Sequence, residues 1–147
     1  MKFEFSLESL LDHRRRVEEM AQRDWAEAQG KVDRAVAKLS EYYDQVDEAR
    51  QRSASLESQG GAQAGALISN SEFIGGQKYR IEAQRQTIRG LKEEAERLQE
   101  ILIEAAKETK TLEKLKERQM EEFKLKRRKL EAKEMDELVV TRFKRAE

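Results

Sequence analysis

The chain has 147 residues, of which 41% are charged and 37% hydrophobic, and it contains neither proline nor cysteine. Long helices favour this composition, because helix interiors reject proline and exposed faces favour Glu, Lys, Arg and Gln. The formal net charge of zero argues against a protein that coats nucleic acid, and the lack of cysteine excludes disulfides and thiolate zinc sites. We therefore expect one elongated all-α domain over 1–147, whose core is a narrow seam of apolar positions between two helices.

The first helix is expected at about residues 6–57, with Ser6 as its N-cap. Apolar residues then recur at steps of three and four, which is the spacing of one helix face. Leu10, Ala21 and Val32 are eleven residues apart, and the spacing becomes heptad after Val32. An eleven-residue spacing predicts that the supercoil is straight or reversed in the first part of this helix.

The pattern breaks over about residues 58–69, a glycine-containing stretch that is the expected loop. A second helix is expected at about 70–143, because Ser69 and Glu72 have the spacing of a capping box. Beyond Leu112 its apolar pattern decays. Before that point the helix keeps its apolar residues in heptad register, at Ile74, Ile81, Ile88, Leu91, Ala95, Leu98, Leu102, Ala105 and Leu112.

Two long amphipathic helices joined by a flexible loop predict an antiparallel coiled-coil hairpin. A parallel homodimer is the alternative, but pairing within one chain has an effective concentration near the millimolar range. The chain alone is therefore expected to be monomeric. With the fold near residue 65, Leu10 lies opposite about residue 120, and residues 125–147 overhang without a partner. This overhang explains the decay of the seam.

Residues suited to catalysis are scarce. His13 is the only histidine and lies on a polar helical segment, where a solvated side chain is the simpler interpretation. Adjacent carboxylates such as Glu93 and Glu94 point away from each other on a helix. We expect no enzyme activity, no cofactor and no metal. The apolar run at 138–140 is too short to span a membrane, and the N-terminus does not resemble a signal peptide, so a cytoplasmic protein is expected.

Two basic runs, 13–16 and 124–129, would meet at the open end of the predicted hairpin. In leucine-zipper factors the zipper follows the basic region, whereas here the heptads precede it. Aromatic residues that could stack on bases do not alternate with the basic ones. These features disfavour binding of DNA or RNA. A contact with another protein and a merely solvated face are the interpretations that stay open.

Three features together resemble the FliJ family, small coiled-coil components of the bacterial flagellar type III export apparatus. The opening FEFSLESLLDHRRRVEEMAQRDWAEA is similar to the start of that family, and the central small-residue break also fits. The segment Lys110–Leu138 is similar to the C-terminal signature, including Met135, Asp136 and Glu137. The resemblance covers essentially the whole chain.

The resemblance implies a fold similar to the stalk subunits of rotary ATPases. It also implies that the end carrying both termini enters the ring of the hexameric flagellar export ATPase. The expected ring contacts are Leu10, Leu11, Arg14, Arg15, Arg16, Phe123, Lys126, Arg127, Arg128, Met135, Asp136 and Leu138. The other end would contact the cytoplasmic domain of the large export-gate subunit. The expected gate contacts are Tyr42, Tyr43, Gln45, Ala49, Phe73, Gln77, Arg80 and Gln84.

By the same resemblance, the protein would couple the ATPase to the gate, aid delivery of substrates and chaperones, and work with the ATPase regulator and export chaperones. It would lie at the inner membrane at the base of the flagellum. Some relatives have aromatic residues where this chain has Gln45 and Ala49. The alternatives are a generic coiled-coil adaptor and the equivalent stalk of a non-flagellar type III secretion system.

Overall fold

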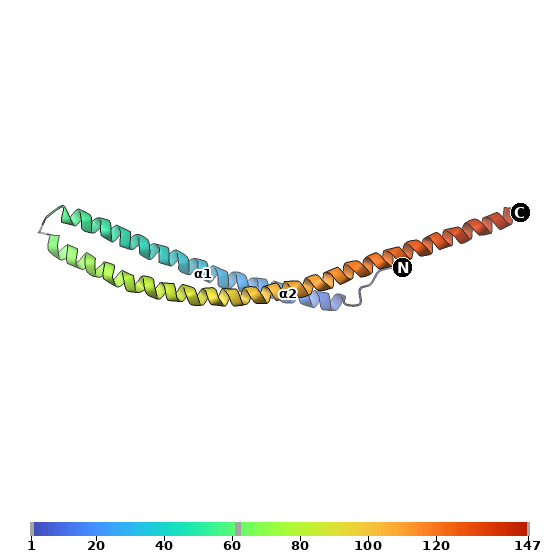
Figure 1. The fold of residues 1–147 in the computed structure, drawn as a ribbon, viewed down its shortest axis with the longest axis horizontal. Coiled ribbons are helices and arrows are strands. Elements are labelled where there is room, and N and C mark those ends of the chain that lie inside the picture. Colours follow the sequence, from blue (N-terminus) through green and yellow to red (C-terminus); the bar gives the residue numbers. More distant parts are fainter. Residues whose placement is uncertain (1, 61–62, 147) are drawn as a thin grey trace. The chain divides into compact units, whose positions relative to one another are not determined.

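A computed structural model describes residues 2–60 and 63–146. They form two helices, α1 (Glu8–Glu57) and α2 (Ala64–Ala146), with no strand in this part of the chain (Figure 1). The helices pack against each other in antiparallel directions, so the predicted all-α hairpin is confirmed.

Packing divides the chain into two compact units, each of which takes a piece from both helices. The terminal unit consists of Met1–Glu19 and Ile103–Glu147, and the loop unit consists of Met20–Leu102. In the terminal unit, Glu8 of α1 pairs with Lys116 of α2. In the loop unit, Gln77 of α2 donates a hydrogen bond to Gln45 of α1. Antiparallel pairing thus holds within each unit.

α1 begins at Glu8, two residues later than residue 6, where we expected it. The Leu7 carbonyl accepts the hydrogen bond of the Leu11 amide at 2.9 Å, and the Glu8 amide donates to the Phe5 carbonyl at 3.1 Å. Ser6 therefore lies in the turn that precedes the helix. The other end of α1, at Glu57, matches the prediction.

α2 begins at Ala64, six residues before the predicted start at 70, so Ser69 and Glu72 lie inside the helix rather than at its cap. The physical reason is a tertiary contact. Asn70 is buried, and its side-chain amide donates to the Ala49 carbonyl at 2.6 Å. This contact with α1 stabilises helical structure around residue 70, so that α2 begins before it. Residues 61 and 62 of the predicted loop lie outside the described residues.

The turn between the helices uses the one described residue with a left-handed backbone. Gly60 has a φ of 90°, a conformation that glycine adopts without strain because it has no Cβ to clash with the backbone. Its amide donates to the Glu57 carbonyl at 3.4 Å, and its carbonyl accepts from the Gln63 amide at 3.3 Å. Gly60 therefore forms the turn that follows the end of α1 at Glu57. Because α2 begins at Ala64, the connection is shorter than the predicted loop at 58–69.

The seam of α1 is heptad from its first turns, so the predicted eleven-residue spacing is wrong. Leu11 is 0% exposed and occupies the seam, whereas Leu10 is 39% exposed. Arg14 and Glu18 take the next two seam positions, and these polar residues hid the pattern in the sequence. A series of buried or half-buried positions runs in steps of three and four, at 11, 14, 18, 21, 25, 28, 32, 35, 39, 42, 46, 49, 53 and 56, and the half-buried residues 8, 17, 29, 30 and 45 lie beside it.

The seam of α2 matches the predicted heptad positions, because every one from Ile74 to Leu112 is buried or half-buried. The best packed part lies in the loop unit. There Ala28, Val32 and Ala95 form a buried cluster, against which Leu91 and Leu98 pack. Small alanines facing leucines let the two backbones approach closely, as in other tightly packed helix pairs.

Every described residue from Lys124 to Ala146 is exposed, in the part of the chain where the sequence predicted an overhang. The register differs from the predicted one, which placed about residue 120 opposite Leu10. Lys116 instead pairs with Glu8 at the start of α1, because α2 begins earlier than expected. The part of α2 just beyond the start of α1 is contacted by the non-helical residues 2–7. Phe3 of this segment contacts Phe123, with ring centroids 5.6 Å apart.

Candidate interaction surfaces

The exposed C-terminal part of α2 carries a block of positive charge followed by apolar side chains. Five of the six residues at 124–129 are basic, and all six are exposed. Arg127 donates a hydrogen bond to Glu131 at 3.2 Å on the same helix. The exposed large apolar residues here are Leu125, Leu130, Met135, Leu138, Val139, Val140 and Phe143. Exposed apolar side chains in this number, next to basic ones, are typical of a protein-binding segment.

Only some of the expected ring contacts in α1 are accessible. Leu11 is fully buried in the seam. Arg14 pairs with Glu108 at 2.6 Å, and Arg15 pairs with Glu113 at 3.4 Å. Leu10, Arg15, Arg16 and all the expected contacts in α2 beyond Phe123 are exposed. The two basic runs therefore do not meet, because the first lies beside residues 108–116 and not beside 124–129.

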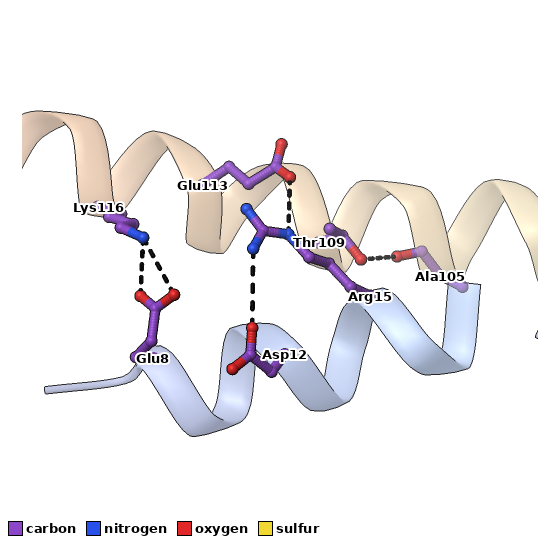
Figure 2. Close-up of polar contacts among 7 residues, drawn as sticks. All are labelled: Glu8, Asp12, Arg15, Ala105, Thr109, Glu113 and Lys116. Carbon is purple, nitrogen blue, oxygen red and sulfur yellow. Dashed lines mark hydrogen bonds and ion pairs between the residues drawn. The ribbon is translucent and has the colours of Figure 1, made fainter. Parts of the chain in front are cut away.

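Ion pairs hold the seam of the terminal unit together (Figure 2). Lys116 reaches both carboxylate oxygens of Glu8, at 2.9 and 3.1 Å, and the guanidinium of Arg15 lies between Glu113 and Asp12. The paired side chains are about one third or more exposed, so each pair contributes roughly 0.2–1 kcal/mol. This seam is weaker than an apolar seam of the same length.

The non-helical residues 2–7 form a strap over α2, a feature that the sequence did not predict. Phe5 is 7% exposed, and Phe3 is half-buried against Phe123. Together with Glu4, Glu8, Lys116 and Met120, the two rings line a hollow on α2. The alternation of Phe3 and Phe5 just before a helix was the only signal in the sequence.

The free energy of holding this strap is close to balance. Burying a phenylalanine side chain contributes about 1.5–3 kcal/mol, and an aromatic pair adds about 0.5–1.5 kcal/mol. Fixing the backbone of six residues costs roughly 1–2 kcal/mol per residue. The gain from the two rings does not exceed this cost, so the strap is held only weakly.

Buried amides link the helices in the loop unit. Asn70, Gln77 and Gln84 are seven residues apart in α2, and each donates a hydrogen bond to α1. The Gln84 amide donates to the Ala35 carbonyl at 2.9 Å. Arg80 donates to the side-chain oxygen Oε1 of Gln77 at 2.9 Å, and Nε2 of Gln77 donates to Gln45. Both the oxygen and the nitrogen of this fully buried side-chain amide are therefore paired. A buried polar row of this kind fixes the register of two helices.

The expected gate contacts divide between this seam and the surface. Gln77 and Ala49 are buried, and Gln45, Gln84 and Tyr42 are half-buried in the seam. Tyr43, Phe73 and Arg80 are exposed. Of the two adjacent tyrosines, Tyr42 thus faces the seam and Tyr43 faces outward.

The exposed aromatics of this set do not gather in one place. The Tyr43 hydroxyl accepts a hydrogen bond from Arg85, whose guanidinium lies 5.8 Å from the ring centroid. Phe73 instead borders a hollow with Arg52 and Leu56. Tyr79, a further exposed aromatic residue on α2, is 83% exposed and is not among the predicted contacts. It lies outside the heptad pattern of apolar residues.

The described residues offer little for chemistry. Within 2–60 and 63–146, no group of three or more His, Asp or Glu side chains is placed to hold a metal ion. The hydrogen bond from Arg97 lowers the pKa of the Glu94 carboxyl below its usual range, but this is an exposed pair within one helix. No described helix contains a stretch long and apolar enough to cross a membrane.

Fold and surfaces together define a coiled-coil hairpin whose C-terminal helical end is exposed and carries a basic run. The family model described as flagellar FliJ protein matches residues 2–147, and the chain therefore belongs to this family. It is a component of the flagellar protein export apparatus. Searches of curated proteins and of solved structures found no significant match.

Proposed function

We propose that this chain is a stalk that couples the hexameric flagellar export ATPase to the membrane export gate and aids delivery of substrates and chaperones. The exposed end of α2 supports this proposal most directly. A single helix whose described residues 124–146 are all exposed, and that carries apolar and basic side chains, suits insertion into a ring.

The charge on that end determines how binding would work. The basic residues 124–129 are followed by acidic Glu131, Glu134, Asp136 and Glu137, so a positive segment of the helix is followed by a mainly negative one. Complementary charges on the inner surface of a ring would fix the axial position of the helix and raise the association rate. The apolar side chains around Leu138 would supply the affinity.

At the other end, the gate contact would be made by the exposed members of the predicted set, Tyr43, Phe73 and Arg80. Tyrosine and arginine are common anchors of protein interfaces. The buried amides fix the register, so a load at one place on the loop unit is passed between the helices without sliding. The protein would thus work at the cytoplasmic face of the inner membrane, at the base of the flagellum.

The first experiment is size-exclusion chromatography with light scattering, on the full chain mixed with the export ATPase and a non-hydrolysable nucleotide. We expect a complex of hexamer size, and we expect deletion of residues 123–147 to abolish it. A stable homodimer that ignores the ATPase would contradict the proposal and favour a generic coiled-coil adaptor.

A charge-reversal variant tests the surface itself. Lys126→Glu, Arg127→Glu and Arg128→Glu together should weaken ATPase binding about tenfold at low salt, because three partly exposed ion pairs are lost. The matched control reverses Arg23, Arg34 and Arg89, which are exposed in the loop unit, and should bind as the wild type does. Equal loss in both variants would point to net charge alone.

The gate contact has its own test. Replacing Tyr43 and Phe73 by alanine should weaken binding to the cytoplasmic domain of the large gate subunit, while Tyr79→Ala serves as an exposed aromatic control. Isothermal titration calorimetry measures both affinities. A loss confined to Tyr79→Ala would move the proposed contact to the other surface of α2.

A further inference from the structure

The strap of residues 2–7 covers the part of α2 from which the exposed end begins. α1 starts only at Glu8, opposite Lys116. Without the strap, Met120 and Phe123 would have no cover from α1. They are the last half-buried apolar positions of α2, and exposed residues follow from 124. The strap therefore masks the first part of a surface that otherwise continues to Ala146.

The contacts that hold the strap are few and non-directional. Phe3 packs on Phe123, and Phe5 is buried. The two hydrogen bonds between its backbone and the helices are both local, from the Glu8 amide to the Phe5 carbonyl and from the Leu11 amide to the Leu7 carbonyl. Ordering the segment opposes the burial of two rings, so a competitor with its own apolar side chains can replace them.

The same region is held by contacts that a charged partner weakens. Beside the strap, Glu8 pairs with Lys116, and both side chains are partly exposed. An acidic partner that approaches the basic residues 124–129 also attracts Lys116, and so loosens the first turn of α1. The strap and the pair that anchors its end thus respond to the same partner.

We propose that residues 2–7 are a displaceable strap, which hides Met120 and Phe123 in the free chain and is released when the ATPase ring binds the end of α2. This inference rests on the proposed function. In the free chain the strap reduces affinity, because only the undocked fraction presents the complete surface. It also keeps two apolar side chains from non-specific contacts until the ring arrives.

Spin labels at two exposed positions test the movement. The chain lacks cysteine, so Lys2→Cys with Lys124→Cys introduces a single pair of labels next to the strap contact. Pulsed dipolar spectroscopy should give a short distance in the free chain and a long, broad distribution in the ATPase complex. The control pair, Arg34→Cys with Glu82→Cys in the loop unit, should not change.

Affinity provides the second measurement. Phe3→Ser with Phe5→Ser should bind the export ATPase at least about threefold more tightly than wild type, because no strap has to be displaced. Met20→Ser with Ile68→Ser removes two exposed apolar residues elsewhere and should leave the affinity unchanged. Helix content by circular dichroism checks that each variant folds.

The outcomes separate the two proposals. If the ATPase binds but the label distance stays short, or the strap variant binds no more tightly, the strap inference is wrong and the stalk proposal stands. A long distance already in the free chain also overturns the inference. If neither wild type nor the strap variant binds the ATPase, the proposed function fails, and the competition inferred from it fails with it.

Discussion

Leu10 and Leu11 show how one residue decides the pairing of two helices. They are adjacent and chemically identical, yet Leu11 is 0% exposed and Leu10 is 39% exposed. Sequence periodicity predicted that Leu10 lies in the seam. The positions that would have indicated Leu11 instead, three and seven residues later, are occupied by the polar residues Arg14 and Glu18. The seam accommodates the polar residue Arg14 because its guanidinium forms an ion pair with Glu108 of α2.

The two leucines give a matched pair of variants. Leu11→Ala should destabilise the terminal unit by roughly 2–5 kcal/mol, the usual cost of removing a buried leucine. Leu10→Ala should change stability by less than about 0.5 kcal/mol, as for a surface site. Hydrogen exchange of residues 8–19 and 105–116 measures both effects. Equal effects of the two changes would contradict the register described here.

Gln77 is the second residue whose role the sequence hid. It is fully buried and paired with both Gln45 and Arg80. Gln77→Ala should lower the free energy of unfolding by about 1–3 kcal/mol, because it leaves the half-buried Gln45 without its donor. Gln86→Ala, at an exposed position of the same helix, is the control. Urea unfolding followed by circular dichroism measures the difference, and no difference would indicate that the buried amide is solvated.

At the scale of elements, the two units use different chemistry along the same pair of helices. In the terminal unit, ion pairs such as Arg14–Glu108 and Lys116–Glu8 link α1 to α2. In the loop unit, the recorded ion pairs lie within one helix, and amides and apolar residues link the two. The terminal unit is therefore suited to local opening, which the strap proposal requires.

Salt should separate the two units. Raising NaCl from about 0.05 M to about 1 M shortens the Debye length to about 3 Å and weakens partly exposed ion pairs. Amide exchange in residues 8–19 and 105–116 should accelerate about two- to tenfold, because each pair contributes at most about 1 kcal/mol. Residues 28–35 and 88–98 should not respond. Uniform acceleration along both helices would argue against a difference in chemistry.

For the whole molecule, the chain should be a monomer when alone. Pairing of α1 with α2 in one chain has an effective concentration near the millimolar range, so a dimer cannot compete at micromolar protein. Light scattering should give the mass of one chain at about 10 μM, well below that range. A concentration-dependent dimer would imply that the exposed end of α2 pairs with a second copy.

Sequence alone determined the helical hairpin, the heptad seam of α2 and the overhang from about residue 125. These follow from composition and periodicity, which act locally along the chain. Only the tertiary structure decided the register, the start of α2 at Ala64 and the burial of Leu11. Each depends on contacts between residues far apart in sequence, such as Asn70 with Ala49 and Glu8 with Lys116. The strap is also decided only by the tertiary structure. It depends on the contact of Phe3 with the distant Phe123, and no periodic pattern in the sequence predicts such a contact.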